Sequence, residues 1–330
     1  MRLPDKENMM GPRLLHASIV SATLMFVAGA DVARGETYPA RPIRIVTAPA
    51  GGANDFLARM LAPGLTAGMG QQIVVDNRPA GVIPGQIVSS ASPDGYTLLC
   101  TTGLLWLLPF MQTVPFDPLK DFLPVTLAMS FPNLLVVHPT VAANSVKELI
   151  ALARAKPGEL NFSSGAGGSN SHLTMELFKS LADINIQRIP YKGEGPAVIG
   201  LLGGQVQMMF ASASAVAAHA KSGKLRILGI SSAQPSTVVP GVPTVAASGL
   251  PGFESVTVIG IFAPAKTPAA IVQRLNQEMV QILHKPEVKE RFLNAGAEAV
   301  GSTPAEFTAM MKADMAKMGR VIKAAGIRTD

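Results

Sequence analysis

The chain has 330 residues, enough for two ordinary domains, and 48% of them are hydrophobic, which excludes a disordered protein. Its formal net charge is +6, but only 5% of its residues are aromatic and no basic cluster is interleaved with them, so nucleic acid is not an expected partner. The single cysteine, Cys100, rules out an internal disulfide and a CxxC metal or redox site.

The N-terminal segment predicts a secretory signal peptide. Three basic residues precede an apolar stretch, Leu14 to Ala30, that ends in the small residues Ala-Gly-Ala. We expect residues 1–35 to be the signal peptide, with cleavage after Ala30 or a few residues later near Gly35. A membrane anchor is the alternative, but it would suit a longer apolar run.

The first predicted elements of the mature chain follow one another as strand, helix and strand. They are a strand at Ile43–Thr47, a helix from Ala53 to about Thr66 and a strand at Ile73–Asp76. This βαβ order favours a parallel sheet. A short helix to Ser90 and, after a Ser-Pro-Asp-Gly turn, a strand at Tyr96–Thr101 follow.

The remaining elements alternate in a similar way. Further strands are expected at Leu134–Val137, Leu160–Ser163, Ile186–Tyr191, Gln205–Phe210, Leu225–Ile230 and Phe253–Phe262. Further helices are expected at Ser145–Ala155, along the periodic run Leu173, Leu177, Phe178 and Leu181, and at Pro196–Leu202, Ala215–Lys221, Pro268–His284 and Pro304–Ala325. The Pro-rich run from Pro235 to Pro251 is interpreted as a surface connection.

Two glycine-rich loops, each between a short strand and a helix, are the most informative repeated feature. Ala50-Gly-Gly-Ala-Asn-Asp55 aligns with Ala166-Gly-Gly-Ser-Asn-Ser171. A helix start leaves backbone N–H groups unpaired at the positive end of the dipole, and glycine lets a ligand approach the backbone. The loops therefore predict anion binding between two lobes. The alternative is a chance likeness, since such turns are common in α/β proteins.

The sequence shows no pattern for a catalytic, cofactor or metal site. It contains no dinucleotide G-x-G-x-x-G in the loops, no phosphate loop, no G-x-S-x-G and no H-E-x-x-H. Of five histidines only His172 lies at a predicted ligand loop, three residues after Ser169 and without an acid placed to orient its ring. We expect His172 to pack or cap in the first turn of a helix, with ligand contact as the alternative.

Seven blocks of sequence carry a family resemblance. They are YPARPIRIV, PAGGANDFLAR, VVDNRPA, SPDGYTLL, PFDPLKDFLPV, SGAGGSNSHLTMELF and IPYKGEGPAVIGLLGGQVQMMF. Together they resemble the substrate-binding proteins of tripartite tricarboxylate transporters, the Bug-type periplasmic receptors. The resemblance covers Tyr38 to the C-terminus.

The resemblance implies both fold and function. The implied fold is α/β and two-lobed, a Venus-flytrap of the type II-like periplasmic-binding-protein class, in which each lobe is a mostly parallel sheet flanked by helices. The implied protein is a periplasmic monomer, not an enzyme, that captures a small carboxylate and delivers it to the permease subunits of a membrane transporter. The alternatives are an exported α/β enzyme acting on a carboxylic acid and a ligand sensor for a signalling system.

The same resemblance predicts the division into lobes. The first lobe is expected to comprise residues 36–136 and 256–330, and the second lobe residues 137–255. Extended segments near Val136–His138 and Phe253–Gly260 are expected to connect them and to absorb a closing rotation.

One segment, Thr101 to Pro109, departs from the family. The family has small and polar residues there, whereas this chain has TTGLLWLLP. If Trp106 or its neighbours line the cleft, the ligand has one carboxylate and an apolar or aromatic body. The alternative is that the leucines pack inside the first lobe.

The candidate ligand contacts come from loops of both lobes. In the first lobe they are Ala50, Gly51, Gly52, Ala53, Asn54, Asp55, Thr102, Gly103, Leu104 and Trp106. In the second lobe they are Ser164, Gly165, Gly167, Gly168, Ser169, Asn170, His172, Tyr191 and Lys192. No cofactor and no metal ion is expected.

Overall fold

The computed structural model describes residues 38–79 and 81–329, so the expected signal peptide, residues 1–35, lies outside the described residues. Residues 41–79 and 81–329 belong to one structural unit. The strands of this unit are β1 (Ile43–Thr47), β2 (Ile73–Asn77), β3 (Thr97–Thr102), β4 (Phe122–Val137), β5 (Asn161–Ser164), β6 (Gln187–Pro190), β7 (Met208–Ser212), β8 (Arg226–Ile230), β9 (Val256–Pro264) and β10 (Glu298–Ala299).

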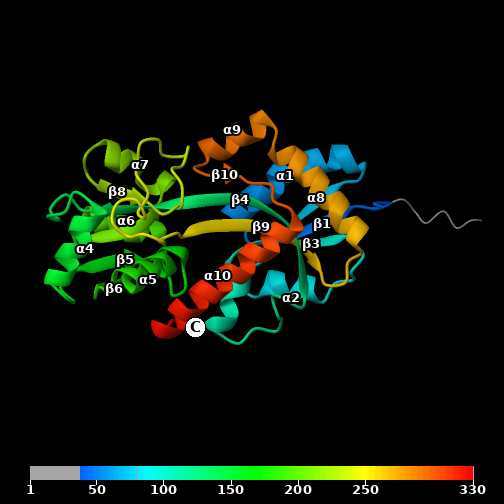
Figure 1. The fold of residues 1–330 in the computed structure, drawn as a ribbon. Coiled ribbons are helices and arrows are strands. Elements are labelled where there is room, and N and C mark those ends of the chain that lie inside the picture. The colour runs from blue at the N-terminus through cyan, green and yellow to red at the C-terminus, as the bar shows by residue number, and fades with distance from the viewer. Residues whose placement is uncertain (1–37, 80, 330) are drawn as a thin grey trace, which may run out of the picture. The chain divides into compact units, whose positions relative to one another are not determined.

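Two long antiparallel strands, β4 and β9, connect two groups of shorter strands (Figure 1). The parallel strands β1, β2 and β3 join the pair through β9. From Phe122 to Pro132, β4 pairs with β9, and from Asn133 to Val137 it pairs with β7 and β8. In this second group β5 is parallel to β6 and β7. We call the part built on β1–β3 the first lobe and the part built on β5–β8 the second lobe. These two strand groups with their helices confirm the expected two-lobed α/β fold.

Helices cover the sheet of each lobe. They are α1 (Ala53–Met69), α2 (Ile83–Ser89), α3 (Leu104–Leu107), the 3₁₀ helix η1 (Leu108–Phe110), α4 (Val146–Ala155), α5 (Asn170–Ala182), α6 (Glu194–Leu202), α7 (Ala213–Lys221), α8 (Ala269–Leu283), α9 (Pro286–Asn294) and α10 (Pro304–Ala324). Because helices lie on both faces, β9 is buried along Val258–Pro264 instead of alternating.

Local capping explains where several helices begin. Thr303 and Glu306 form a reciprocal capping box at α10, and Pro304 takes the first helical position, where a missing N–H costs nothing. At α4, Ser145 Oγ accepts the N–H of Glu148 (3.2 Å), as the capping box predicts. The carboxylate of Glu148, however, accepts the N–H of Asn144 (2.8 Å), so only half of the box forms.

Two segments differ from their sequence predictions. No helix is predicted from the sequence at residues 104–110, but α3 and η1 turn the leucine-rich run into helix, and residues 105–108 are buried in the first lobe. The predicted strand Leu134–Val137 is only the end of β4, which has 16 residues. β4 contains two prolines: the pairing register shifts just after Pro124, and Pro132 is the last residue paired with β9.

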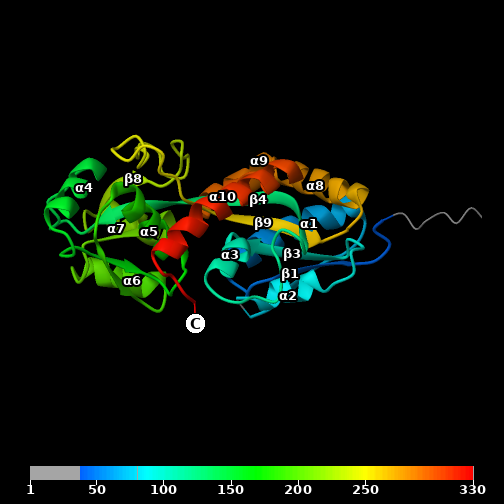
Figure 2. The ribbon, with the colours of Figure 1, turned by 60° about the horizontal axis from the view of Figure 1, so that its bottom comes forward.

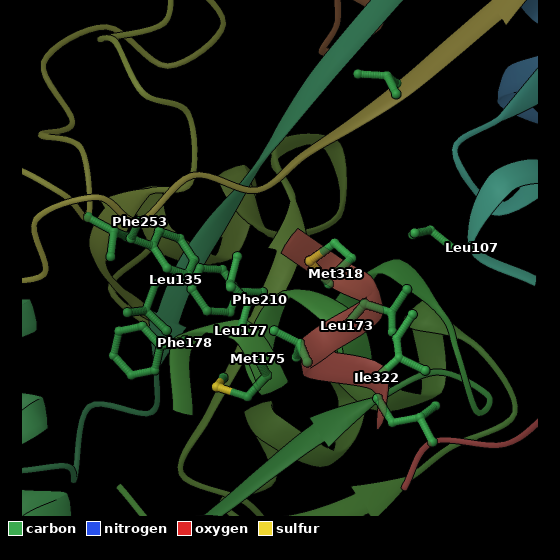
Figure 3. Packing of buried hydrophobic residues seen from close by; sticks show 14 of the residues in the cluster. Leu107, Leu135, Leu173, Met175, Leu177, Phe178, Phe210, Phe253, Met318 and Ile322 are labelled. Carbon is green, nitrogen blue, oxygen red and sulfur yellow. The ribbon is translucent and has the colours of Figure 1, made fainter. Parts of the chain in front are cut away.

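Helix α10 contacts both lobes (Figure 2). It packs against β4 and α3 of the first lobe and against α5 of the second. Met318 and Ile322 of α10 lie beside Leu173 of α5, and all three belong to one buried cluster (Figure 3). The position of α5 is therefore fixed from two sides, by its own lobe and by α10.

Three phenylalanines fix the other side of α5. Phe178 of α5, Phe210 of β7 and Phe253, just before β9, have ring centroids 5.5–5.9 Å apart (Figure 3). Aromatic pairs at this distance stabilise a core beyond their buried area. Within residues 38–79 and 81–329, no helix is long and apolar enough to cross a membrane.

Candidate functional site

The loop between β5 and α5 is held by its own hydrogen bonds. The N–H of Gly165 donates to Ser171 Oγ (3.1 Å) and the N–H of Gly168 donates to His172 Nδ1 (3.2 Å). The N–H of Ser169 donates to a carbonyl within the loop (3.0 Å). Gly168 has a φ of 72°, a left-handed conformation that favours glycine. Most of the loop N–H groups are therefore occupied and cannot bind a ligand.

Further donors, without a hydrogen-bond partner among the described residues, lie in the first turn of α5, which follows the loop. Leu173 donates to Ser169 O (2.9 Å), so the N–H groups of Asn170, Ser171 and His172 have no carbonyl partner inside the helix. Three N–H groups at the positive end of a 13-residue helix suit a carboxylate. These candidate donors, residues 170–172, thus begin at the last residue of the predicted donor range, residues 167–170.

The side chain of His172 supports the loop, which corrects the candidate assignment of its ring, whereas its backbone N–H remains a candidate donor. Its side chain is buried, and burial together with the positive charges of Arg188 and Lys179 lowers its pKa to about 4. The ring is therefore neutral at pH 7. Nδ1 accepts the N–H of Gly168, so the proton is on Nε2, 3.8 Å from Glu176 Oε1.

Arg188 in β6 is a supporting residue that sequence reasoning missed. Its Nε donates to Ser164 Oγ (2.7 Å) and its Nη2 donates to Gly165 O (2.8 Å). Burial lowers the pKa of Arg188, and the nearby Glu176 opposes this. Ser164 is buried in this network, which corrects its assignment as a ligand contact. A single arginine in a four-residue strand gives no periodic signal from which its role could be predicted.

The first glycine loop has the same design. Asp55 is buried and its carboxylate accepts the N–H of Gly51 (3.0 Å), Arg59 Nε (2.9 Å) and Asn77 Nδ2 (2.9 Å). Its side chain is therefore a structural acceptor and not a ligand contact. Because Phe56 donates to the carbonyl of residue 52 (2.9 Å), the available N–H groups are those of residues 53, 54 and 55.

Asp55→Ala is expected to lower the free energy of unfolding by about 1–3 kcal/mol, because Gly51 and Asn77 lose their acceptor. Burial would raise the pKa of Asp55, but the hydrogen bonds and the charge of Arg59 outweigh it and hold this pKa below 3.8. A pKa depressed by folding means that the stabilisation is complete above about pH 4 and is lost as pH falls through the folded-state pKa.

Chemical unfolding of both proteins between pH 3 and pH 7 tests this prediction. The difference in free energy of unfolding between the wild-type protein and Asp55→Ala should be constant above about pH 5 and should become smaller toward pH 3. Glu159→Ala, which removes an exposed ion pair with Lys156, should change stability by less than about 1 kcal/mol. A difference that does not vary with pH would contradict the assignment.

A pocket of about 590 Å³ opens between the lobes, and we call it the interlobe pocket. The segment between β3 and α3 and the start of α5 border it, together with β4, the start of β9 and α10. Its lining residues are Thr102, Gly103, Leu104, Leu107, Leu127, Ser130, Gly168, Ser169, Asn170, Leu173, Glu254, Ser255, Val256, Thr257, Val258, Val300, Met310, Ala313, Asp314, Lys317 and Met318. Residues of both lobes therefore meet at one cavity.

A smaller pocket of about 210 Å³ lies beside it in the first lobe. Asn54, Thr102 and Leu104 line this pocket, and Thr102 and Leu104 also line the interlobe pocket. Among the described residues, Asn54 Oδ1 is buried without a hydrogen-bond partner. The two pockets thus flank the segment before α3, and the start of α1 borders the smaller one.

The structure brings together only part of the predicted site. Thr102, Gly103, Leu104, Gly168, Ser169 and Asn170 line the interlobe pocket, and Asn54 lines the smaller one. The other predicted loop residues line neither pocket: Ala50, Gly51, Gly52 and Ala53 are exposed, Gly165 is buried and Gly167 is partly exposed.

Trp106 lines neither of these pockets and is fully buried, which corrects its assignment as a ligand contact. Its side chain is fully buried, and its ring packs against Phe262 and Phe307 with centroids 6.2 and 6.0 Å away. Its indole N–H donates to Asp314 Oδ2 (2.8 Å). The neighbouring Leu104 and Leu107 do reach the interlobe pocket, so the run faces both the core and the cavity.

Tyr191 and Lys192 line neither pocket. The hydroxyl of Tyr191 donates to Gln205 Oε1 (3.0 Å), and Lys192 is exposed. A third pocket, of about 500 Å³, lies at α7 and β8 and has no residue of either glycine loop. No group of three or more His, Cys, Asp or Glu residues that could hold a metal ion occurs in the described part of the chain.

Comparison with known proteins finds a matching family and similar relatives. Residues 57–327 match the model of a family described as tripartite tricarboxylate transporter family receptor. The chain is 38% identical over 313 residues to the protein BugT of Bordetella pertussis, which covers 92% of this chain and 96% of BugT.

Two solved structures are also similar. Rpa4515 of R. palustris, solved with adipate, is 33% identical with a TM-score of 0.73, over 88% of this chain and 99% of that one. MatC (Rpa3494) of Rhodopseudomonas palustris, solved with bound malate, is 27% identical with a TM-score of 0.68, over 86% of this chain and 100% of that one. The chain therefore belongs to the tripartite tricarboxylate transporter receptor family, the Bug-type solute-binding proteins.

Proposed function

We propose that the protein is a periplasmic receptor that captures a small carboxylate between its lobes and delivers it to the permease subunits of a tripartite transporter. The observation that carries the proposal is the set of first-turn N–H groups of α5 beside a cavity bordered by both lobes. Relatives solved with adipate and with malate support a carboxylate ligand. The receptor acts as a monomer and carries out no catalysis.

Neutral donors suffice to hold the carboxylate. A helix N-terminus contributes about 0.3–1 kcal/mol, and up to about 2 when partly buried, while each hydrogen bond to a charged group adds about 1.5–3 kcal/mol. A few such contacts reach the roughly 8 kcal/mol of a micromolar complex. Asp55 does not oppose the anion, because its carboxylate is engaged by Gly51, Arg59 and Asn77. No arginine clamp is needed.

The body of the ligand lies against apolar side chains in this proposal. Leu104, Leu107, Leu173, Val258 and Met318 line the interlobe pocket. Burial of a benzene-sized face against such a surface stabilises binding by about 2 kcal/mol at about 25 cal/mol per Å². A ligand with one carboxylate and an alkyl or aromatic body therefore fits better than citrate.

Binding is proposed to close the lobes. The extended crossings β4 and β9 carry the chain between the lobes, and α10 contacts both of them. Residues 36–136 with 256–330, and residues 137–255, are the proposed moving parts, and removal of residues 1–35 is proposed to release the receptor into the periplasm.

A carboxylic acid screen tests the proposal. The melting temperature of the mature protein should rise with a subset of the acids. Calorimetry with these acids should show saturable binding of one ligand per protein. The ligand recovered afterwards should be chemically unchanged. Small-angle scattering at saturation should give a smaller radius of gyration. Conversion of the acid would favour an enzyme, and superimposable scattering curves would contradict closure.

A further inference from the structure

The α10 side of the interlobe pocket carries an acid that the carboxylate site does not use. Asp314 is partly exposed and lines the pocket. Its Oδ2 accepts the indole N–H of Trp106 (2.8 Å), the one hydrogen bond that the described residues make to this side chain. A carboxylate can accept several hydrogen bonds, so Asp314 has acceptor capacity left for a ligand.

The charged side chains in the pocket lining are together negative. Glu254, Asp314 and Lys317 are the charged residues that line the interlobe pocket. Lys317 Nζ donates to the backbone carbonyl of Glu254 (2.9 Å), which fixes the ammonium at the rim. Two carboxylates against one ammonium give a formal charge of −1. Burial raises the pKa of Asp314, as expected of a carboxylate whose charge is incompletely compensated.

The pocket lining therefore contains two kinds of group with opposite ligand preferences. The first-turn N–H groups of α5 favour an anion, whereas Asp314 favours a hydrogen-bond donor or a cation. Apolar residues of α3, α5 and β9 lie in the same lining, namely Leu107, Leu173 and Val258. A ligand that fills this cavity needs a carboxylate, an apolar body and a donor group.

We propose that Asp314 is a specificity-determining residue that accepts a hydrogen bond from the terminal ammonium or hydroxyl group of an ω-substituted monocarboxylic acid. The inference rests on the proposed function, because it requires a carboxylate at α5. It also implies discrimination against dicarboxylates, since their second carboxylate would lie in the same pocket as the carboxylates of Asp314 and Glu254.

Four acids of equal chain length test the proposal by calorimetry: 6-aminohexanoate, 6-hydroxyhexanoate, hexanoate and adipate. They differ only at the far end, and adipate is the ligand solved with a relative. Wild-type protein should bind 6-aminohexanoate about tenfold or more tighter than adipate, because a hydrogen bond to a charged group is worth about that factor. 6-Hydroxyhexanoate should lie between them.

Asp314→Asn is the decisive variant, because its amide oxygen still accepts the indole N–H of Trp106 while the charge is lost. It should weaken 6-aminohexanoate about tenfold or more, change hexanoate less than about threefold and strengthen adipate. Asp183→Asn is the matched control: Asp183 is exposed at the opposite end of α5 in a left-handed conformation that asparagine accepts. It should leave all four affinities unchanged.

Three results would overturn the inference. In the first, adipate binds as tightly as 6-aminohexanoate. In the second, Asp314→Asn weakens the binding of hexanoate and of 6-aminohexanoate equally. In the third, none of the four acids binds although other carboxylates do. The second result would mean that Asp314 only positions Trp106. If no carboxylic acid of any kind binds, the proposed function itself fails, which is a different outcome.

Discussion

Ser169→Phe is expected to abolish carboxylate binding, with a loss of about a hundredfold or more, while the protein stays folded. Ser169 precedes α5 and lines the interlobe pocket, so a phenyl ring there fills the space before the N–H groups of Asn170 and Ser171. Its backbone is in the extended region (φ −61°, ψ 156°), which phenylalanine adopts without strain.

Stability should change little in this variant. Ser169 makes no side-chain capping bond, and the hydrogen bond of its Oγ within the described residues is to Ser171 Oγ (3.3 Å). Removal of the Ser169 hydroxyl should therefore lower the free energy of unfolding by less than about 1 kcal/mol. Calorimetry and thermal unfolding of Ser169→Phe, with Ser169→Ala as the control that keeps the space open, check both points. Full affinity in Ser169→Phe would place the ligand elsewhere.

Trp106→Ala is expected to destabilise the protein by about 3–5 kcal/mol, a large fraction of the 5–15 kcal/mol typical of a folded protein. The indole is fully buried between Phe262 and Phe307, and its removal also leaves Asp314 without its donor. Trp106→Phe keeps most of the ring packing and should cost less, about 1–3 kcal/mol, through the lost indole N–H.

Circular dichroism is the measurement for these variants, because Trp106 is the only tryptophan of the chain and its fluorescence disappears with it. Urea unfolding curves give the free energies. A loss below about 1 kcal/mol in Trp106→Ala would contradict the core position and would restore Trp106 as a cleft residue.

Local patterns predicted most of the fold because local physics sets those features. Ile43–Thr47 was predicted at its observed bounds, and α10 begins at the Pro304 that its capping residues indicate. The glycine-rich loops before α1 and α5 were likewise readable, because a strand, a glycine turn and a helix start occur within about ten residues.

Tertiary context decided the features that the sequence did not predict. Pro124 and Pro132 argue against a continuous strand, yet β4 contains both. Pro124 lies next to a shift in pairing register, and Pro132 lies where β4 stops pairing with β9. The leucine-rich run at residues 104–108 gives no clear periodicity, and it became helical because it covers the first-lobe core. Asp314 meets Trp106 across 208 residues, a contact that no local pattern encodes.

The two glycine-rich loops were predictable in position, but their hydrogen bonds were not. The sequence located the loops, while the structure assigned the loop N–H groups of Gly165 and Gly168 to Ser171 and His172. Side chains expected to face a ligand, such as Asp55, proved to be internal acceptors. Hydrogen-bond partners depend on three-dimensional distances. Residue types alone could therefore not show which backbone N–H groups are paired within the protein and which are left for a ligand.

Amide chemical-shift mapping of the ¹⁵N-labelled mature chain with the tightest carboxylate from the screen tests the central claim most directly. The claim is that the carboxylate lies on the first turn of α5, between the lobes. The largest shift changes should occur at the amides of Asn170, Ser171 and His172, with further changes at Thr102 to Leu104 across the interlobe pocket. Saturable binding that leaves these amides unmoved and shifts residues of the α7–β8 pocket would contradict the account.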